Sequence, residues 1–311
     1  MNAALLEQQK KLDEMLKKQN AELRRDTTQE ALAQSRKMLE DMEADGLLAK
    51  GTTEVKQEHL GSFEGLAAEV KKAFNERFFD RRTLKYDRNS QAANAMALYM
   101  GLAEPQYEEV VLKNLIDDIR GRGNAVTAGD IGYRYVVQTL QDRGASDVLF
   151  DMNSRYDVPG YGYQLACGET ALAESWMSKD YLSHNHCMLG HLYSWLFNGL
   201  GGLSQAPGSV GYKEVVIDPQ VVGDIRSARV AFESPYGLIR SEWNDTPQTF
   251  RQTVEIPGNA SALVYLPTAD PEAISENGQP LDKIEGITVE RKGDRTVLHV
   301  GSGVYNFSVR K

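Results

Sequence analysis

The feature that most constrains this chain is a change in the period of its apolar residues near residue 205. Before that point apolar residues recur every three to four positions, the period of an amphipathic helix, and proline is rare. Beyond it, short β-branched runs are separated by Gly, Pro, Asn and Asp. A chain of 311 residues commonly forms about two domains. We therefore expect a multidomain α-then-β protein, helical first and all-β afterwards.

The helical half divides into several short amphipathic segments. Predicted helices cover residues 62–78, 92–102, 107–119, 127–140, 147–152 and 186–200. Helices that follow one another through short loops pack as antiparallel hairpins. The spacing thus predicts a stack of helix hairpins over residues 61–205.

The first residues are set apart by their charge. Leucines such as Leu5 and Leu12 recur there at helical spacing, and Thr27 with Glu30 has the spacing of a capping box that would start a second helix. We expect a charged helical hairpin over residues 1–46, assigned to a unit of residues 1–60. Its apolar seam spans too few heptads for a coiled coil, so packing on the body is the first interpretation and self-association through these helices the second.

The β half contains eight candidate strands at regular spacing. They cover residues 214–217, 228–234, 237–244, 250–256, 260–266, 287–292, 296–300 and 303–309. Asn277-Gly278 is a strong hairpin signal, because a type I′ turn needs a positive φ at both central positions. This pattern predicts an antiparallel β-sandwich or jelly roll over residues 206–311.

Composition argues against several classes of function. The chain has 35 Lys and Arg against 44 Asp and Glu, a net charge of −9, which disfavours nucleic-acid binding and an anionic membrane surface. The sequence has no apolar run long enough to span a bilayer and no export signal at its start. We expect a cytoplasmic protein as the sequence stands, or a periplasmic or secreted one if its N-terminus is truncated. The two cysteines, Cys167 and Cys187, fit one bridge or two free thiols.

Residues that carry chemistry are concentrated between positions 155 and 195. Three of the five histidines lie there, and Tyr and Trp alternate with Asp157, Glu169 and Glu174. Aromatic faces stack on sugar rings, while carboxylates and amides bond sugar hydroxyls. Carbohydrate binding is one interpretation of this segment, and aromatic packing within a helical core is the other.

Other chemistries have less support. On a helix that begins near Asn185, His186 and His191 would differ by about 140° around the axis and would not converge on one metal ion. A thiol dyad of Cys167 and His186 has no support in the flanking residues. No phosphate-binding loop in a strand–helix context and no Ser-centred nucleophile elbow occurs. We therefore expect neither a metal ion nor a cofactor.

Several short strings in this segment and around it occur in an order that is typical of one known family. The string GETALAESW at residues 168–176, followed by Asn185-His186, resembles the bacterial α-L-rhamnosidases of glycoside hydrolase family 78. Supporting strings lie at residues 90–102, 127–133, 151–152, 161–163, 236–237 and 301–307. The resemblance extends over residues 65–311.

The resemblance implies an (α/α)6 toroid followed by a β-sandwich, and inverting hydrolysis of terminal α-L-rhamnosides. It places the general base at Glu174 and a contact with the rhamnose at His186. Tyr161, Trp176 and Asn185 would shape the pocket for a rhamnose-containing carbohydrate. Each of these roles comes from the family motif and not from residue spacing.

The resemblance leaves the general acid without a position in this chain. In the family the acid belongs to a cluster upstream of every matched string, whereas residues 1–60 contain no Trp and no such cluster. Asp130, Asp157 and Glu169 are candidates for the acid but fit better as hydroxyl-binding or structural carboxylates, and we place Asp130 and Glu169 among the sugar contacts. We expect the first part of the toroid to be missing or to be replaced by the helical hairpin. The alternatives are a non-catalytic relic or glycan-binding protein, and a helical interaction protein acting through residues 1–46.

Overall fold

The computed structural model describes residues 57–311, with side chains from residue 65 onward. The predicted hairpin of residues 1–46 and its capping box lie outside the described residues. The chain divides into two compact units, Met1–Val70 and Lys71–Lys311, and the second unit contains both the helical and the β domain. The first described helix, α2 (Gln57–Phe78), begins five residues before the predicted start at Ser62.

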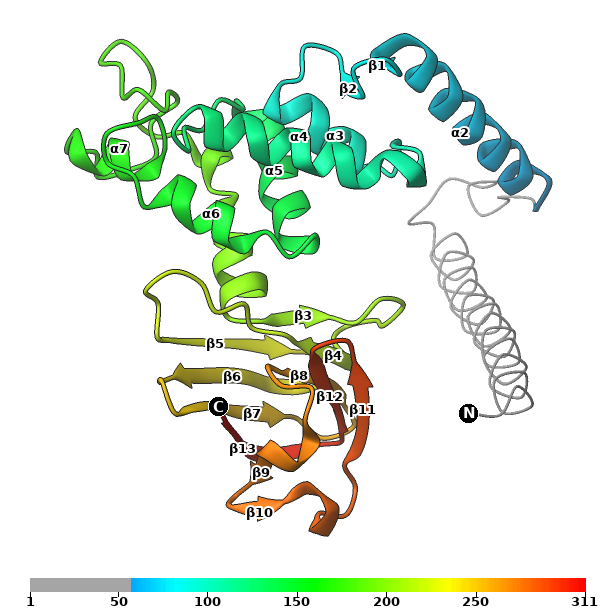
Figure 1. Ribbon diagram of the computed structural model, residues 1–311, viewed down its shortest axis with the longest axis vertical. Helices are drawn as coiled ribbons and strands as arrows, with labels where there is room; N and C mark the ends of the chain where they lie inside the picture. The colour runs from blue at the N-terminus through cyan, green and yellow to red at the C-terminus, as the bar shows by residue number, and fades with distance from the viewer. Residues whose placement is uncertain (1–56) are drawn as a thin grey trace, which may run out of the picture. The chain divides into compact units, whose positions relative to one another are not determined.

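Short helices make up the helical domain, as the apolar period predicted (Figure 1). They are α3 (Gln91–Tyr99), α4 (Glu108–Gly121), α5 (Asp130–Asp142), α6 (Ser146–Asn153), α7 (Tyr161–Ala166) and α8 (Leu192–Ser194), together with the 3-10 turns η1 (Pro105–Tyr107) and η2 (Cys187–Leu189) and the small hairpin of β1 (Phe79–Asp80) and β2 (Lys85–Tyr86). The first four of these helices lie within three residues of their predicted bounds. The sequence pattern did not predict α7.

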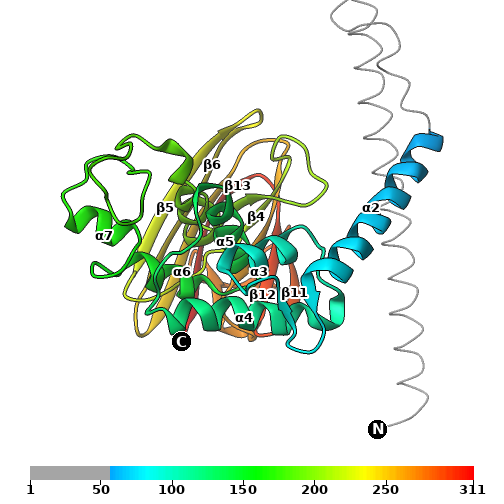
Figure 2. The same cartoon turned by 90° about the horizontal axis from the view of Figure 1, so that it is seen from above.

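The helical core forms where α3, α4, α5 and α6 bring their apolar faces together (Figure 2). The hydroxyl of Ser90 caps α3 by accepting a hydrogen bond from the Ala93 N–H at 3.2 Å. A Cβ on Gly132 would lie 2.7 Å from the Cβ of Ala92, so α3 and α5 approach too closely for any larger residue there. The buried face of α5 carries Val136 and Leu140. This layer supports the loop that holds the candidate site.

The single helix predicted over residues 186–200 is wrong in its first third. The chain forms η2, then α8, which continues as the π-helical segment η3 (Trp195–Leu200). The His186 N–H donates to the Leu172 carbonyl at 2.7 Å, which holds residue 186 against another loop segment and not in a helix. The helical-wheel argument about His186 and His191 therefore does not apply.

Two sheets make up the β domain. The six-stranded sheet has the order β10-β9-β13-β7-β6-β5 and the five-stranded sheet the order β11-β12-β8-β4-β3. The strands are β3 (Leu203–Gln205), β4 (Glu214–Ile217), β5 (Ser227–Ser234), β6 (Gly237–Asp245), β7 (Thr249–Ile256), β8 (Ser261–Leu266), β9 (Ile274–Glu276), β10 (Gln279–Pro280), β11 (Thr288–Lys292), β12 (Arg295–Val300) and β13 (Gly303–Arg310), with the turns η4 (Pro271–Ala273) and η5 (Leu281–Lys283).

The predicted antiparallel sandwich is confirmed, and every predicted strand lies within one residue of its observed bounds. All pairs are antiparallel except β4 with β8, which run parallel. Asn277 and Gly278 have φ of 47° and 81°, so the expected positive-φ turn joins β9 to β10. The short strands β3, β9 and β10 were not predicted, since two or three residues cannot establish a period.

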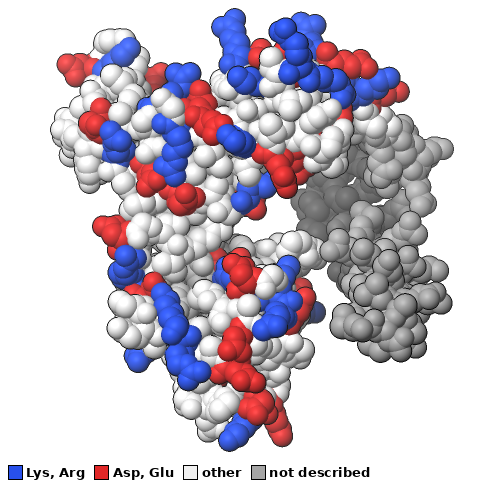
Figure 3. All heavy atoms as spheres, in the orientation of Figure 1, with Lys and Arg blue, Asp and Glu red and all other residues white. Residues whose placement is uncertain are grey.

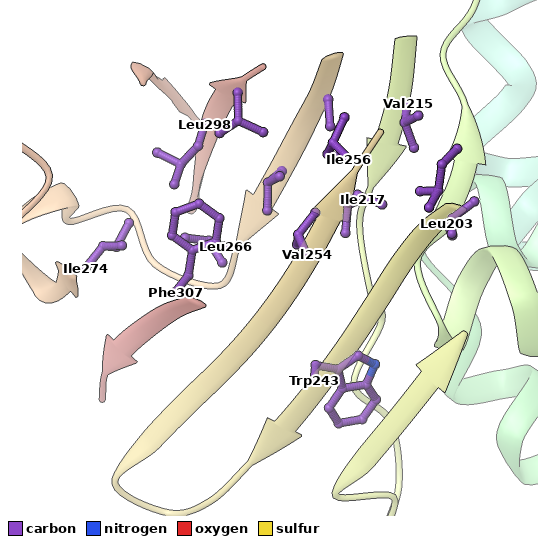
Figure 4. Close-up of a cluster of buried hydrophobic side chains, with 14 of the residues drawn as sticks. Leu203, Val215, Ile217, Trp243, Val254, Ile256, Leu266, Ile274, Leu298 and Phe307 are labelled. Atoms are coloured by element: carbon purple, nitrogen blue, oxygen red, sulfur yellow. The ribbon is translucent and has the colours of Figure 1, made fainter. Parts of the chain in front are cut away.

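The core of the sandwich lies between the two sheets (Figure 4). Alternate residues of facing strands point inward and are almost fully buried, as Val254 of β7 and Val264 of β8 illustrate. The largest of these side chains is Trp243, which is 1% exposed and lies 6.1 Å from the Phe250 ring, centroid to centroid. The same core reaches Leu200 at the end of the helical domain.

The sandwich binds the end of the helical domain through main-chain carbonyls. The Trp243 indole N–H donates to the Leu200 carbonyl at 2.7 Å, and the Ser241 hydroxyl donates to the Gly201 carbonyl at 2.9 Å. Gly202 has φ of 76°, and a Cβ there would lie 2.3 Å from the Pro219 nitrogen. These contacts fix the linker between the two domains.

One core position is chemically out of place, which leads to a prediction. Gln252 is 1% exposed, pairs with Trp243 and Phe307 on the neighbouring strands, and neither its amide N nor its amide O bonds a described protein group. Gln252→Met is therefore expected to raise the free energy of unfolding by about 1–3 kcal/mol, because it removes an unpaired buried amide at nearly constant volume. Urea denaturation would measure this, with the exposed Gln248→Met as control. A less stable Gln252→Met protein would contradict the expectation.

Acidic and basic side chains are interspersed among uncharged residues on the visible face of the helical and β domains (Figure 3). Within residues 57–311 no helix is both long and apolar enough to cross a bilayer.

Candidate functional site

The loop between α7 and η2 presents Glu174 to solvent. The Glu174 N–H donates to the Ser183 carbonyl at 2.8 Å, and the Ser183 N–H donates to Oε2 of Glu174 at 3.1 Å. Together with the bond from His186 to Leu172, these contacts place residues 172–174 beside residues 183–186. No ion pair within residues 65–311 includes Glu174. Its carboxylate is therefore positioned by the main chain and not neutralised by a described cation.

An aromatic cluster lies in the helical core at this loop. The Trp176 indole is 8% exposed, donates its N–H to the Ala128 carbonyl at 2.8 Å, and meets the Tyr133 and Tyr161 rings edge-on at 4.9 and 5.1 Å. The Tyr161 hydroxyl donates to the Leu189 carbonyl, and burial raises the pKa of Tyr161.

The pocket-lining role expected for Trp176 stays a prediction, and the burial of its ring argues against it. A ring that is buried and hydrogen-bonded at its only polar atom offers little face for a sugar to stack on. Trp176 instead anchors the loop beneath Glu174, and half-buried Tyr161 packs against it. For these two residues core packing, the other interpretation of the aromatic segment, describes the structure better.

Asp130 and His186 come together although they are far apart in the sequence. Nε2 of His186 lies 3.6 Å from Oδ2 of Asp130, and their side chains are 18% and 38% exposed. Asp130 opens α5, where its carboxylate accepts the Ile131 N–H at 2.9 Å and is favoured by the helix dipole. Nε2 of His186 is buried without a hydrogen-bond partner among the described residues. Nε2 thus faces the Asp130 carboxylate and is shielded from solvent, while the Asp130 side chain itself is partly exposed beside it.

Glu169 and Asn185 lie at the edge of the same loop. Oε2 of Glu169 contacts Nδ1 of His184 at 2.7 Å, so its carboxylate has a partner within the protein. Asn185 is exposed, and its main-chain N–H donates to the Ser183 hydroxyl at 3.2 Å. Its side-chain amide has no partner among the described residues. The sugar contacts expected for Asn185 and Glu169 stay predictions.

Asp157 is unsuited to the role of general acid. It forms a two-pronged ion pair with Arg155, with contacts of 2.7 and 2.6 Å. The hydrogen bonds from Arg155 lower the pKa of the Asp157 carboxyl. A general acid needs the opposite shift, because it must still hold its proton near neutral pH.

The contact between His184 and Glu169 predicts a pH dependence. The hydrogen bond to Glu169 raises the pKa of His184 above 6.5. Because the folded-state pKa is the higher one, the pair stabilises the fold fully below the unfolded pKa of about 6.5 and loses that effect as the pH rises through the folded value. The difference in urea midpoint between wild type and Glu169→Gln should therefore shrink from about pH 5 to pH 9. A difference that stays constant over this range would refute the coupling.

Gln164 on α7 is a residue that sequence reasoning missed. It is 3% exposed, and its amide N donates to the carbonyls of Ala173 and Ser175 at 3.2 and 3.1 Å. Its amide O accepts the Ala173 N–H at 3.4 Å. A lone Gln in an unpredicted six-residue helix carries no sequence signal. The glycine at position 162 is a clearer sequence signal. A Cβ there would lie 2.1 Å from the Arg155 carbonyl oxygen, so α7 can occupy this place only with glycine.

Among the described residues, the remaining reactive groups form no second centre. Cys167 and Cys187 are both exposed and free, so of the two interpretations the free thiols are confirmed. No group of three or more His, Cys, Asp or Glu side chains that could hold a metal ion occurs within the described part of the chain. A hollow of about 510 Å³ between the two domains is lined by Asp142, Asp218 and Gln220, among others, and Glu174 does not line it.

Comparison with known proteins gives this architecture a class. The model of the bacterial alpha-L-rhamnosidase 6 hairpin glycosidase domain matches residues 15–200, and that of the bacterial alpha-L-rhamnosidase C-terminal domain matches residues 202–280. Helix hairpins joined to a sandwich in this order define a six-hairpin glycosidase with its C-terminal β domain. The first match also reaches fifty residues further upstream than the motifs did.

Curated and solved relatives agree with this class. An α-L-rhamnosidase of Streptomyces avermitilis is 26% identical over 272 residues, 85% of this chain and 25% of that protein. One of Formosa agariphila is 29% identical over 230 residues, 71% of this chain and 24% of that protein. Among solved structures, α-L-rhamnosidase from Dictyoglumus thermophilum has a TM-score of 0.73 at 26% identity, over 83% of this chain and 29% of that one.

A second solved relative carries a sugar. The Streptomyces avermitilis enzyme complexed with L-rhamnose has a TM-score of 0.72 at 26% identity, over 80% of this chain and 24% of that one. The chain belongs to the bacterial α-L-rhamnosidase family. It spans about a quarter of the length of the curated relatives it matches. The boundary near residue 60 between a separate helical hairpin and the glycosidase portion stays a prediction.

Proposed function

We propose that this chain is an α-L-rhamnosidase-like glycoside hydrolase that acts on terminal α-L-rhamnosides with inversion, with Glu174 as general base. Membership of the family supports the reaction class, and the relative solved with L-rhamnose supports the sugar. The activity of the whole relatives does not transfer directly, because this chain spans only about a quarter of their length.

One observation carries the proposal: the Glu174 carboxylate is exposed, unpaired with any described cation and oriented by the Ser183 N–H. A general base must be ionised and must reach water. In the proposed step Glu174 takes a proton from a water molecule whose oxygen attacks the anomeric carbon. The bond to the leaving oxygen breaks on the opposite face, and that oxygen takes a proton from an acid. No described residue is assigned as this acid.

Neighbouring groups would bind the sugar. The exposed side chain of Asn185 and the pair of His186 and Asp130 are assigned to the sugar hydroxyls, the pair through its exposed atoms, since Nε2 of His186 is buried. Trp176 and Tyr161 hold the loop from below. Glu169 holds His184 through Oε2, and its other carboxylate oxygen is assigned to a sugar hydroxyl.

The proposal is tested by following an activated aryl α-L-rhamnoside with the full chain by proton NMR. Inversion requires the β-anomer of L-rhamnose to appear first and the α-anomer to grow in by mutarotation. First appearance of the α-anomer would contradict inversion. Absence of turnover would contradict the proposed hydrolase activity.

A second candidate is a glycan-binding protein without catalysis. An inverting enzyme needs two carboxyl groups, and among the described residues only a base is assigned, which favours this candidate. Binding of L-rhamnose in calorimetry without release of the aryl group would support it. Interaction or self-association through residues 1–46 stays a prediction, since those residues lie outside the described part.

A further inference from the structure

The proposed chemistry assigns no role to the buried side-chain amide of Gln164. Its three hydrogen bonds go to the two residues that flank Glu174, namely Ala173 and Ser175. Both N–H groups of an amide can donate and its oxygen can accept, so this side chain meets main-chain donors and acceptors as a neighbouring strand would. Gln164 thus joins α7 to the main chain on both sides of the proposed base.

The contacts on Glu174 itself complete this arrangement. Its N–H and its Oε2 both bond the main chain of Ser183, at 2.8 and 3.1 Å. Residues 173–175 are therefore bound by Gln164 through the flanking peptides and by Ser183 through the central residue. Without the amide of Gln164, the described protein would leave the carbonyls of Ala173 and Ser175 with no side-chain donor.

Gln164 is itself firmly held. The main-chain N–H of Gln164 donates to the Gly160 carbonyl at 3.2 Å. Gly162 packs α7 against the Arg155 main chain with no room for a side chain. The amide reaches the loop from a short helix whose place is fixed by close packing. A displacement of the loop would have to break the hydrogen bonds, because α7 cannot follow it easily.

We infer that Gln164 is a positioning residue for the Glu174 carboxylate, setting its place through the peptides of Ala173 and Ser175. This inference rests on the proposed role of Glu174 as general base. Gln164 touches no reacting atom, so its effect is expected on kcat more than on substrate binding. A misplacement of about 1 Å in a reacting group can cost about 10²-fold in rate.

The test uses the full chain with Gln164→Met, which keeps the length of the side chain and removes its hydrogen bonds. The matched control is Gln138→Met on α5, where the amide oxygen has no described partner. Amide hydrogen exchange is measured over peptides covering residues 172–186 and over the sandwich, and kcat and KM are measured on an aryl α-L-rhamnoside. Gln164→Met should speed exchange in residues 172–186 alone and lower kcat by about 10- to 100-fold with KM nearly unchanged. Gln138→Met should do neither.

Two further measurements keep the inference separable from the function. If wild type shows no turnover, the proposed function fails, while the exchange experiment and a ¹³C titration of the Glu174 carboxyl in wild type and Gln164→Met still decide the positioning role. If Gln164→Met does not fold, Gln164→Glu replaces it: protonation returns one donor, so the protection of residues 172–186 relative to the intrinsic exchange rate should rise toward the wild-type value as the pH falls. Unchanged exchange and an unchanged Glu174 titration in these variants would overturn the inference, as would an equal effect of Gln138→Met.

Discussion

Glu174→Gln is expected to lower kcat on an activated aryl α-L-rhamnoside by about 10²–10⁴-fold, the usual contribution of a general base. The amide keeps the size of the side chain and can still accept the Ser183 N–H through its oxygen, so the loop should keep its place. It cannot take a proton from water. KM should therefore change much less than kcat, and steady-state kinetics on the full chain measure both values.

A carboxylate elsewhere provides the control for this substitution. Glu242 is exposed on β6 in the sandwich and lies 3.9 Å from Arg229, so Glu242→Gln makes the same chemical change far along the chain from the loop. It should leave kcat within experimental error of wild type. If Glu174→Gln keeps more than about a tenth of wild-type kcat, Glu174 is not the base.

Trp243→Ala is expected to lower the free energy of unfolding by about 3–5 kcal/mol, the range for removing a large aromatic from a core. Trp243 is the largest fully buried side chain, and its indole N–H bonds the Leu200 carbonyl at 2.7 Å. The substitution removes packing between the sheets and the bond that holds the end of the helical domain. Urea unfolding followed by far-ultraviolet circular dichroism measures the loss.

Trp243→Phe separates the two contributions. The smaller ring keeps much of the apolar contact with Phe250 but leaves the Leu200 carbonyl without its donor, so a loss of about 1–3 kcal/mol is expected. Tyr236→Ala, at a ring that is 37% exposed, should stay within about 0.5 kcal/mol of wild type. If Trp243→Phe is as stable as wild type, the bond to the linker carbonyl contributes nothing.

The strands were predictable because their signal is local. In β7 the alternation of Phe250, Val254 and Ile256 with outward residues reports one buried face, and Asn277-Gly278 marks the turn between β9 and β10 by backbone chemistry alone. The family motif around Glu174 was equally visible in the sequence. The position of Glu174 within the loop was not visible in the sequence, since it depends on hydrogen bonds to the main chain of Ser183.

Other site features required the folded chain. His186 was expected at a helix start but is held by the Leu172 carbonyl, a contact between loop segments. Trp176 has the same sequence context whether its ring faces a sugar or the core, and only packing against Tyr133 and the Ala128 carbonyl distinguishes the two. Gln164 reaches Ala173 and Ser175 across a loop of irregular backbone, which no periodicity describes.

The sequence by itself determined the order of the domains, the bounds of the strands of four or more residues and the identity of the acidic residue proposed as base, since periodicity, turn chemistry and motif are properties of neighbouring residues. Tertiary structure alone decided which aromatic rings are buried, that Asp130 meets His186 and that Gln164 binds beside Glu174. These outcomes depend on the close packing of α5, α7 and the loop, where a hydrogen bond or a missing Cβ selects one arrangement among several that the local sequence allows.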